Sequence, residues 1–163
     1  MLTLPRIVDR PETPYVAVRE AVTLPFDDQI PAILSRLFAA MEERGVAPAG
    51  PLYFRHNVID MPRIEMDFAV PVASPEAGGG PLVAGILPAG RYAEVTWFGP
   101  YDSLIDVNGI LIGWAQHCGI MFDMHQAPSG DHFAGRVEIY HNGPDTEPDP
   151  EKLKTTVAIK LRD

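Results

Sequence analysis

The sequence predicts an α+β protein in which one strand–helix–strand unit occurs twice. An extended stretch opens at Tyr15 and leads into a helical run that stops at Gly45, 30 residues later. A second stretch opens at Tyr92, and its helical run stops at Gly119, 27 residues later. At 18 and 17 residues after these glycines come two tripeptides of one pattern, Arg63-Ile64-Glu65 and Arg136-Val137-Glu138. Repeated units of this kind pack about a pseudo-twofold axis, and the groove on that axis is a natural place for a small ligand.

The first repeat is expected to span about residues 5–73. Its β-rich stretch Tyr15–Val22 predicts the opening strand. Apolar residues recur at helical spacing from Ile30 to Met41, which predicts an amphipathic helix that Gly45 ends. Alternating patterns then predict two further strands, Leu52–Ile59 and Ile64–Val72.

The second repeat, residues 82–163, is expected to follow a Gly-rich linker over residues 74–81, so that residues 1–163 form a single domain. The linker contains Gly78-Gly79-Gly80, which lacks the spacing of a phosphate-binding loop. A helix with apolar positions from Leu104 to Cys118 precedes Gly119. Strands are predicted on both sides of it, at Leu82–Leu87, Arg91–Phe98, Phe133–Tyr140 and Thr155–Leu161.

The composition indicates a globular protein and argues against binding of nucleic acid. Of the 163 residues 46% are hydrophobic and 21% charged, and 13 basic against 22 acidic residues give a net charge of −9. No cluster of Lys or Arg is present, so a neutral or cationic organic partner suits the charge better than a polyanion does. The single cysteine, Cys118, excludes an internal disulfide, and the N-terminus resembles no signal peptide. We therefore expect a cytoplasmic protein that does not span a membrane.

Glu138 is the residue at which chemistry is predicted. Alternation places Arg136, Glu138 and Tyr140 on one face of a strand, with Val137 and Ile139 on the other. If this face lines a cleft, a carboxylate among aromatic rings forms a site for a cation. A solvent-exposed face with a neighbouring Arg–Glu pair explains the pattern equally well. The repeat assigns Glu65 the corresponding position in the first half, where the exposed face is the favoured interpretation.

The candidate ligand-binding residues combine this glutamate with aromatic and histidine side chains, each of which is also compatible with an ordinary core position. Trp97 stands out by its place just before a Gly-Pro turn. No metal or other cofactor is expected, because Asp123, His125, Asp131 and His132 lack a zinc-binding spacing and suit a solvated loop. The predicted ligand-binding set is Glu138, Tyr140, Trp97, Tyr53, Phe133, Trp114, Tyr101 and His56.

Several short motifs, in this order along the chain, resemble the GyrI-like small-molecule-binding family. They run from about Pro5 to Leu161 and are Tyr15-Val16-Ala17-Val18-Arg19, Gly50-Pro51-Leu52-Tyr53, Leu87-Pro88-Ala89-Gly90-Arg91-Tyr92-Ala93, Gly99-Pro100-Tyr101-Asp102, Arg136-Val137-Glu138-Ile139-Tyr140, Pro148-Asp149-Pro150 and Val157-Ala158-Ile159-Lys160-Leu161. This family supplies the effector-binding domain of AraC-type and multidrug-responsive transcription regulators.

The resemblance implies a duplicated β-α-β-β unit with pseudo-twofold symmetry, an antiparallel sheet with two main helices, and a central groove, the fold shared with SOUL proteins. It also implies that the groove is lined by aromatics and holds a buried glutamate, which Glu138 matches here. Trp97, Tyr53 and Tyr140 fall on strands that line the family's groove. No helix-turn-helix segment accompanies these motifs, so the chain is expected to be a stand-alone member.

Three functions are compatible with this resemblance. The first is a binding protein that senses or sequesters small hydrophobic, cationic or polycyclic compounds. The second is a hydrolase of cyclopropane-bearing toxins, in which Glu138 activates water and Tyr140 donates a hydrogen bond to the leaving oxygen. The third is interaction with a protein partner, such as inhibition of DNA gyrase.

Overall fold

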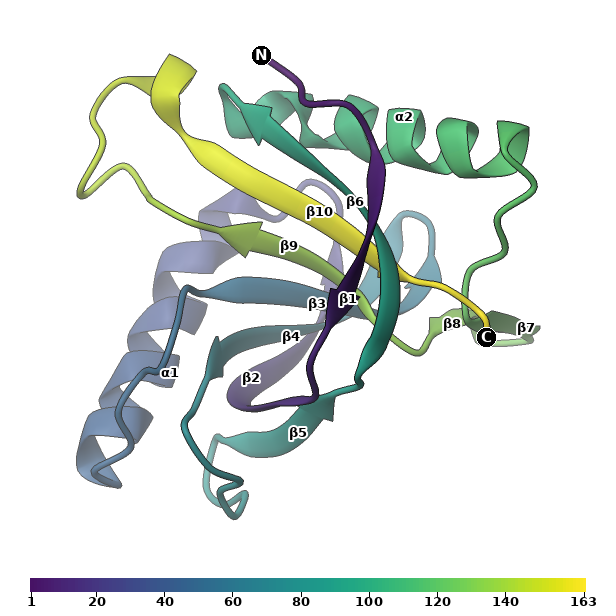
Figure 1. Ribbon diagram of the computed structural model, residues 1–163. Helices are drawn as coiled ribbons and strands as arrows, with labels where there is room; N and C mark the ends of the chain where they lie inside the picture. Colours follow the sequence, from purple (N-terminus) through teal and green to yellow (C-terminus); the bar gives the residue numbers. More distant parts are fainter.

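The computed structural model describes all 163 residues and contains the predicted α+β repeat (Figure 1). Each half supplies a long strand, a helix and two further strands. In the first half these are β2 (Thr13–Thr23), α1 (Ile30–Glu43), β3 (Tyr53–Asp60) and β4 (Arg63–Pro71). In the second half they are β6 (Gly90–Phe98), α2 (Leu104–His117), β9 (Arg136–Tyr140) and β10 (Lys154–Lys160).

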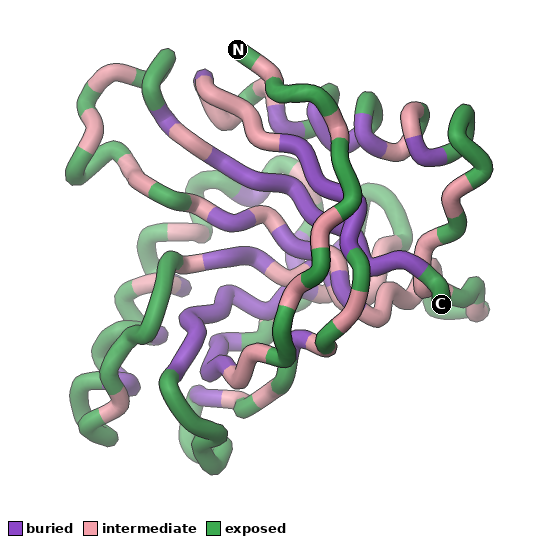
Figure 2. The backbone as a smooth tube through the Cα atoms, in the orientation of Figure 1, coloured by how far each residue is buried: buried purple, intermediate pink, exposed green.

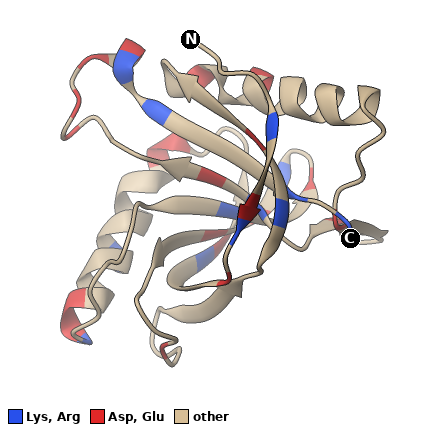
Figure 3. Ribbon diagram, in the orientation of Figure 1, with Lys and Arg blue, Asp and Glu red and all other residues tan.

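The strands form one curled antiparallel sheet whose order is symmetric about its centre. That order is β1-β6-β10-β9-β3-β4-β2-β5, so the two halves meet where β3 pairs with β9. The edge strands β1 (Arg6–Arg10) and β5 (Val83–Leu87) are exchanged, because β1 pairs with β6 and β5 pairs with β2. This exchange ties each half to the other through backbone hydrogen bonds. The sequence analysis predicted no strand at β1, which carries charged residues where it crosses β6 (Figure 3).

The two helices are built alike. Each has 14 residues, follows a short 3-10 turn (Asp27–Gln29 or Tyr101–Ser103), and is followed by a glycine with positive φ. Gly45 has φ of 66° and Gly119 has φ of 69°, and the residue after each glycine closes the helix by bonding a carbonyl five residues back. The predicted helix ends are therefore confirmed. Neither helix is long and apolar enough to cross a membrane.

Buried residues fill three clusters on the two faces of the sheet (Figure 2). One cluster lies beneath α1 and a second beneath α2. The third lies on the opposite face and includes Tyr15, Tyr53, Tyr92 and Val137. The aromatic side chains are thus divided between the face that the helices cover and the face that they do not.

The strand pairing corrects the predicted equivalence of Glu65 and Glu138. Strand β9 corresponds to β3, since each is the strand that meets the other half, whereas Glu65 lies on β4. Phe54 pairs directly with Glu138 across the centre of the sheet and occupies its position in the first half. The tripeptides Arg63-Ile64-Glu65 and Arg136-Val137-Glu138 therefore open non-equivalent strands, and their similarity does not reflect the repeat.

The segments between these elements differ from the sequence prediction in one place. Residues 74–81 form the connection from β4 to β5, without helix or strand apart from one isolated bridge between Gly79 and Leu82. The segment around His125 and His132, however, is a two-stranded hairpin rather than a loop. Its strands are β7 (Met124–Ala127) and β8 (Gly130–Phe133), and β8 also pairs with β3.

Candidate functional site

The candidate site lies on β9, on the face of the sheet that is covered by the helices. Arg136, Glu138 and Tyr140 face this side, while Val137 and Ile139 belong to the buried cluster on the other face. Across the central pairing Glu138 lies opposite Phe54 of β3. The fold therefore brings a half-buried carboxylate to the junction of the two repeats.

Both oxygens of Glu138 accept hydrogen bonds from uncharged donors. The Asn108 amide of α2 donates to Oε1 at 2.9 Å, and the Tyr140 hydroxyl donates to Oε2 at 2.7 Å. Asn108 also donates to the carbonyl of Leu104, and its Oδ1 accepts from Arg136 Nη2 at 3.0 Å. A single amide side chain thus links the helix, the glutamate and the arginine.

Burial and the Glu138 charge together fix the protonation of the neighbouring groups. Burial, the Glu138 charge and the hydrogen bond to it raise the pKa of Tyr140 well above 10, so its hydroxyl stays a donor. Burial lowers the pKa of His56; Glu138 partly opposes this effect and Arg136 adds to it, which leaves the pKa at about 4. The pKa of Arg136 is lowered by burial as well, with partial compensation from Glu138. At neutral pH the cluster therefore holds one negative charge, one positive charge and a neutral imidazole.

Aromatic rings surround the Tyr140 end of this cluster. The Tyr140 ring meets Phe54 edge-on at a centroid distance of 4.7 Å and Tyr101 at 5.6 Å. At the other end the guanidinium of Arg136 lies 4.8 Å from the ring centroid of Phe133. The ring edges and faces next to a carboxylate supply the type of surface that binds an apolar cation.

Five of the eight predicted residues belong to this neighbourhood. Glu138 and Tyr140 form its centre, Tyr101 packs on Tyr140, Phe133 packs on Arg136, and the electrostatic coupling of His56 to Glu138 places it nearby.

Tyr53 lies apart from these five, whereas Trp97 and Trp114 pack against the same core cluster beneath α2 as Tyr101, Phe133 and Tyr140. Tyr53 faces the opposite side of the sheet, where its ring meets Tyr15 at 5.7 Å. The indole of Trp97 donates to the carbonyl of Pro100 at 2.9 Å within its own turn. Trp114 follows Asn108 by six residues, which places the two about 120° apart around the helix.

Two residues of the site were absent from the predicted set: Asn108, which donates to Glu138, and Phe54, which lies opposite Glu138 and packs on Tyr140. Asn108 is 8% exposed, and its signal was a single amide within the apolar stripe of the second predicted helix. Phe54 could not be identified from the sequence, because the neighbouring Tyr53 is also aromatic. Alternation by itself does not show which of the two faces the helices.

Asp123, His125, Asp131 and His132 form no hydrogen bond with this cluster, although the charge of Asp131 acts on Arg136. No group of three or more His, Cys, Asp or Glu side chains is arranged to hold a metal ion. Instead the rings of His125 and His132 stack at a centroid distance of 4.9 Å. They line a cavity of about 450 Å³, to which Phe133 is the only contributor among the predicted ligand-binding residues.

Comparison with known proteins places this geometry within a family. The sequence profile of the GyrI-like small molecule binding domain matches residues 3–162. A search of curated proteins gave no match.

Solved structures show the same fold at low sequence identity. The crystal structure of the EcmrR C-terminal domain is similar with a TM-score of 0.79 at 17% identity, and the alignment covers 98% of each chain. EcmrR in its DNA complex has a TM-score of 0.80 and 17% identity, but the 98% of this chain that aligns spans only 57% of that chain. SAV2435 bound to tetraphenylphosphonium has a TM-score of 0.63 and 11% identity, over 98% of this chain and 94% of SAV2435.

Proposed function

The chain belongs to the family of GyrI-like small molecule binding domains, and on that premise we propose that it binds small hydrophobic cations at Glu138. One observation carries the proposal: the half-buried carboxylate is held by two neutral donors, Asn108 and Tyr140, and forms no salt bridge. A carboxylate in this state is oriented but keeps its charge available to a ligand.

The surroundings of Glu138 match the apolar part of such a ligand. Phe54, Tyr101 and Tyr140 present aromatic surface around one end of the carboxylate. Cation–π attraction and loss of apolar surface from water then add to the charge interaction. The similar protein SAV2435 has been solved with tetraphenylphosphonium, which is a cation of this class.

Isothermal titration calorimetry with tetraphenylphosphonium tests the proposal. Glu138→Gln preserves the shape of the side chain and removes its charge, so we expect binding to weaken by about 1–3 kcal/mol, the scale of the attraction between opposite charges several ångströms apart in a partly buried site. The fold should be retained, with an unchanged or slightly higher melting temperature. Glu20→Gln is the matched control, because Glu20 pairs with Arg36 outside this cluster. Equal affinities of the wild type and Glu138→Gln would remove Glu138 from the site.

A second candidate function follows from the contact between Glu138 and Tyr140. A carboxylate is suited to activate water, and the neighbouring tyrosine hydroxyl is suited to donate a hydrogen bond to a strained electrophile. The hydroxyl now donates to Glu138 at 2.7 Å, so it must leave the carboxylate before it can serve a substrate. Turnover of an electrophilic cyclopropane compound by the wild type, nearly abolished in Glu138→Gln, distinguishes a hydrolase from a binding protein. Binding without turnover rejects the hydrolase.

A further inference from the structure

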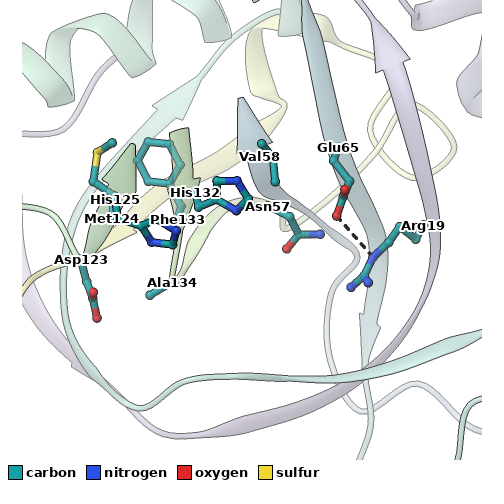
Figure 4. Close-up of a pocket in the computed structure, with 10 residues that line it drawn as sticks. All are labelled: Arg19, Asn57, Val58, Glu65, Asp123, Met124, His125, His132, Phe133 and Ala134. Carbon is teal, nitrogen blue, oxygen red and sulfur yellow. Dashed lines mark ion pairs between the residues drawn. The ribbon is translucent and has the colours of Figure 1, made fainter. Parts of the chain in front are cut away.

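The cavity of about 450 Å³ lies where the β7–β8 hairpin joins the sheet (Figure 4). Its volume of about 450 Å³ lies within the range of small-molecule sites. Both halves of the chain line it: Arg19, Asn57, Val58 and Glu65 come from the first, and residues 123–125 and 132–134 from the second. A smaller hollow of about 160 Å³ shares Val58, Glu65 and His132 with it. Neither hydrogen-bond partner of Glu138 lines either hollow, although Phe133, which packs on Arg136, contributes to the larger one.

A β-bulge directs Asn57 into this cavity. The register of β3 against β4 shifts between His56 and Val58, which leaves Asn57 as the extra residue. Figure 4 shows its side chain in the space between His132 and Arg19. The amide lies close enough to Asp67 to help lower the pKa of that carboxyl, but the geometry falls short of a hydrogen bond, so the buried Nδ2 has no hydrogen-bond partner. A buried donor without a partner costs free energy that an acceptor on a ligand would recover.

The charges around the cavity leave one carboxylate available to a ligand. Asp67 beneath it is engaged by Arg19 through hydrogen bonds of 2.7 and 3.0 Å, and Asp123 at its rim pairs with Lys160 at 3.1 Å. Glu65 has only a long contact of 3.9 Å to Arg19 Nε, without a hydrogen bond. Its side chain is 44% exposed, so its oxygens are open to a cationic donor.

The wall opposite Glu65 is flat and partly aromatic. The rings of His125 and His132 stack at an interplanar angle of 14°, and Met124 and Phe133 add apolar atoms from the same hairpin, while Val58 lies beside Glu65 on the neighbouring strand. Flat π surfaces favour offset stacking of a planar ring. The lining thus combines a planar surface, an amide donor and a carboxylate whose one ion pair is the long contact to Arg19.

We propose that this cavity binds a planar aromatic compound that carries an amidine or amino group and a hydrogen-bond acceptor. The cationic group donates to Glu65, the ring lies along His132, and the acceptor receives the Asn57 Nδ2 hydrogen. This site is separate from Glu138 and does not depend on the function proposed for it.

A titration with 6-amidino-2-naphthamide, followed by NMR of the histidine rings, tests the proposal. Its uncharged isostere 2,6-naphthalenedicarboxamide is the matched ligand control. In the wild type we expect the amidine to shift the His125 and His132 signals and to bind about tenfold more tightly than the isostere, which corresponds to one charge-assisted hydrogen bond. Glu65→Gln should abolish this preference, whereas Glu20→Gln should retain it.

Two further variants make each outcome decisive. Val58→Trp fills the cavity and should abolish the histidine shifts without removing any charge. Glu138→Gln should leave the shifts intact. If the amidine loses affinity only in Glu138→Gln, or if Glu65→Gln and Val58→Trp both bind it as the wild type does, the proposed site is rejected. Tetraphenylphosphonium binding reports on Glu138 independently.

Discussion

The two halves of the chain carry carboxylates on opposite faces of one sheet, in contrasting surroundings. In the second half Glu138 is half-buried on the helix-covered face, and its position in the first half is taken by Phe54. In the first half Asp67 is 0% exposed on the other face, and it pairs across the strands with Arg19. The corresponding pair in the second half is Thr156 with Thr96. At these two positions, therefore, one half has a carboxylate where the other has an uncharged residue, although Glu94 of the second half is also buried and pairs with Arg6 and Arg10.

The hydrogen-bond partners show what this difference means. Asp67 receives hydrogen bonds from Arg19 and from the Tyr15 hydroxyl at 2.7 Å, and Arg55 donates to that hydroxyl at 2.9 Å. Its charge is therefore compensated inside the protein. Glu138 has only neutral donors, and the cationic Arg136 reaches it through Asn108. We infer that the carboxylate of the first half stabilises the fold and that of the second half is available to a ligand.

The largest expected effect tests the structural role of Asp67. Asp67→Asn leaves Arg19 and Tyr15 without their charged acceptor and should lower the free energy of unfolding by about 3–4 kcal/mol at pH 7. Burial alone would raise the pKa of Asp67, but the Arg19 and Tyr15 hydrogen bonds outweigh it and hold that pKa below 3.8. The contribution of Asp67 to the free energy of unfolding is therefore complete above pH 3.8. It is lost as the pH falls through the lower pKa that Asp67 has in the folded protein. Urea titrations of the wild type and Asp67→Asn at pH 7 and pH 3 measure the stability loss and its dependence on pH. If Asp67→Asn is as stable as the wild type at pH 7, Asp67 does not stabilise the fold.

The helix-covered face should respond to acid in a different range. His56 has a pKa of about 4 in the folded protein against 6.5 when unfolded, so below pH 6.5 the unfolded state binds a proton that the folded state does not. Stability should fall by about 2–3 kcal/mol between pH 6.5 and 4 and then level off with respect to this group. His56→Gln should remove this dependence of stability on pH between pH 6.5 and 4, and it should leave the dependence due to Asp67 at lower pH. An unchanged slope between pH 6.5 and 4 would assign it to other groups.

A smaller effect is expected at the position that corresponds to Asp67. The Thr156 hydroxyl lies 2.8 Å from the hydroxyl of Thr96 and 2.8 Å from His141 Nε2. Thr156→Val removes these neutral hydrogen bonds and should cost about 1.5 kcal/mol, roughly half the cost of Asp67→Asn. Thermal unfolding of Thr156→Val and Asp67→Asn, measured side by side, gives the ratio of the two stability losses. Equal losses would mean that the charge of Asp67 contributes nothing beyond its hydrogen bonds.

The smallest expected effect concerns the feature that the halves share most closely. Gly45 and Gly119 have the same positive φ, and a Cβ at either would meet no atom within 4 Å. Substitution by alanine should therefore lower the free energy of unfolding by about 1 kcal/mol at both positions, because of backbone strain alone. Gly113→Ala, inside α2 with open space around it, should instead stabilise slightly, because alanine is the better helix former. If Gly45→Ala and Gly119→Ala lose clearly unequal amounts of stability, the two helix ends differ.

Local patterns in the sequence determined the helices, their glycine ends and the alternation on β9. These features depend on residues within a few positions of one another: periodic apolar residues for a helix, glycine for a positive φ, and a two-residue period for a strand. Because of this local origin, the placement of Glu138 and Tyr140 on one face and of Val137 and Ile139 on the other could be read before the fold was known.

Only the tertiary structure decided which strands pair, in which register, and which face the helices cover. The exchange of β1 and β5, the pairing of Phe54 with Glu138 and the contact from Asn108 all join residues at least 30 positions apart, and no local period records such pairing. The same limit made the Arg63-Ile64-Glu65 match misleading and left Tyr53 and Phe54 indistinguishable. A shift of one residue in register moves every side chain of a strand to the other face, so the surroundings of a glutamate are set by pairing rather than by its neighbours in the chain.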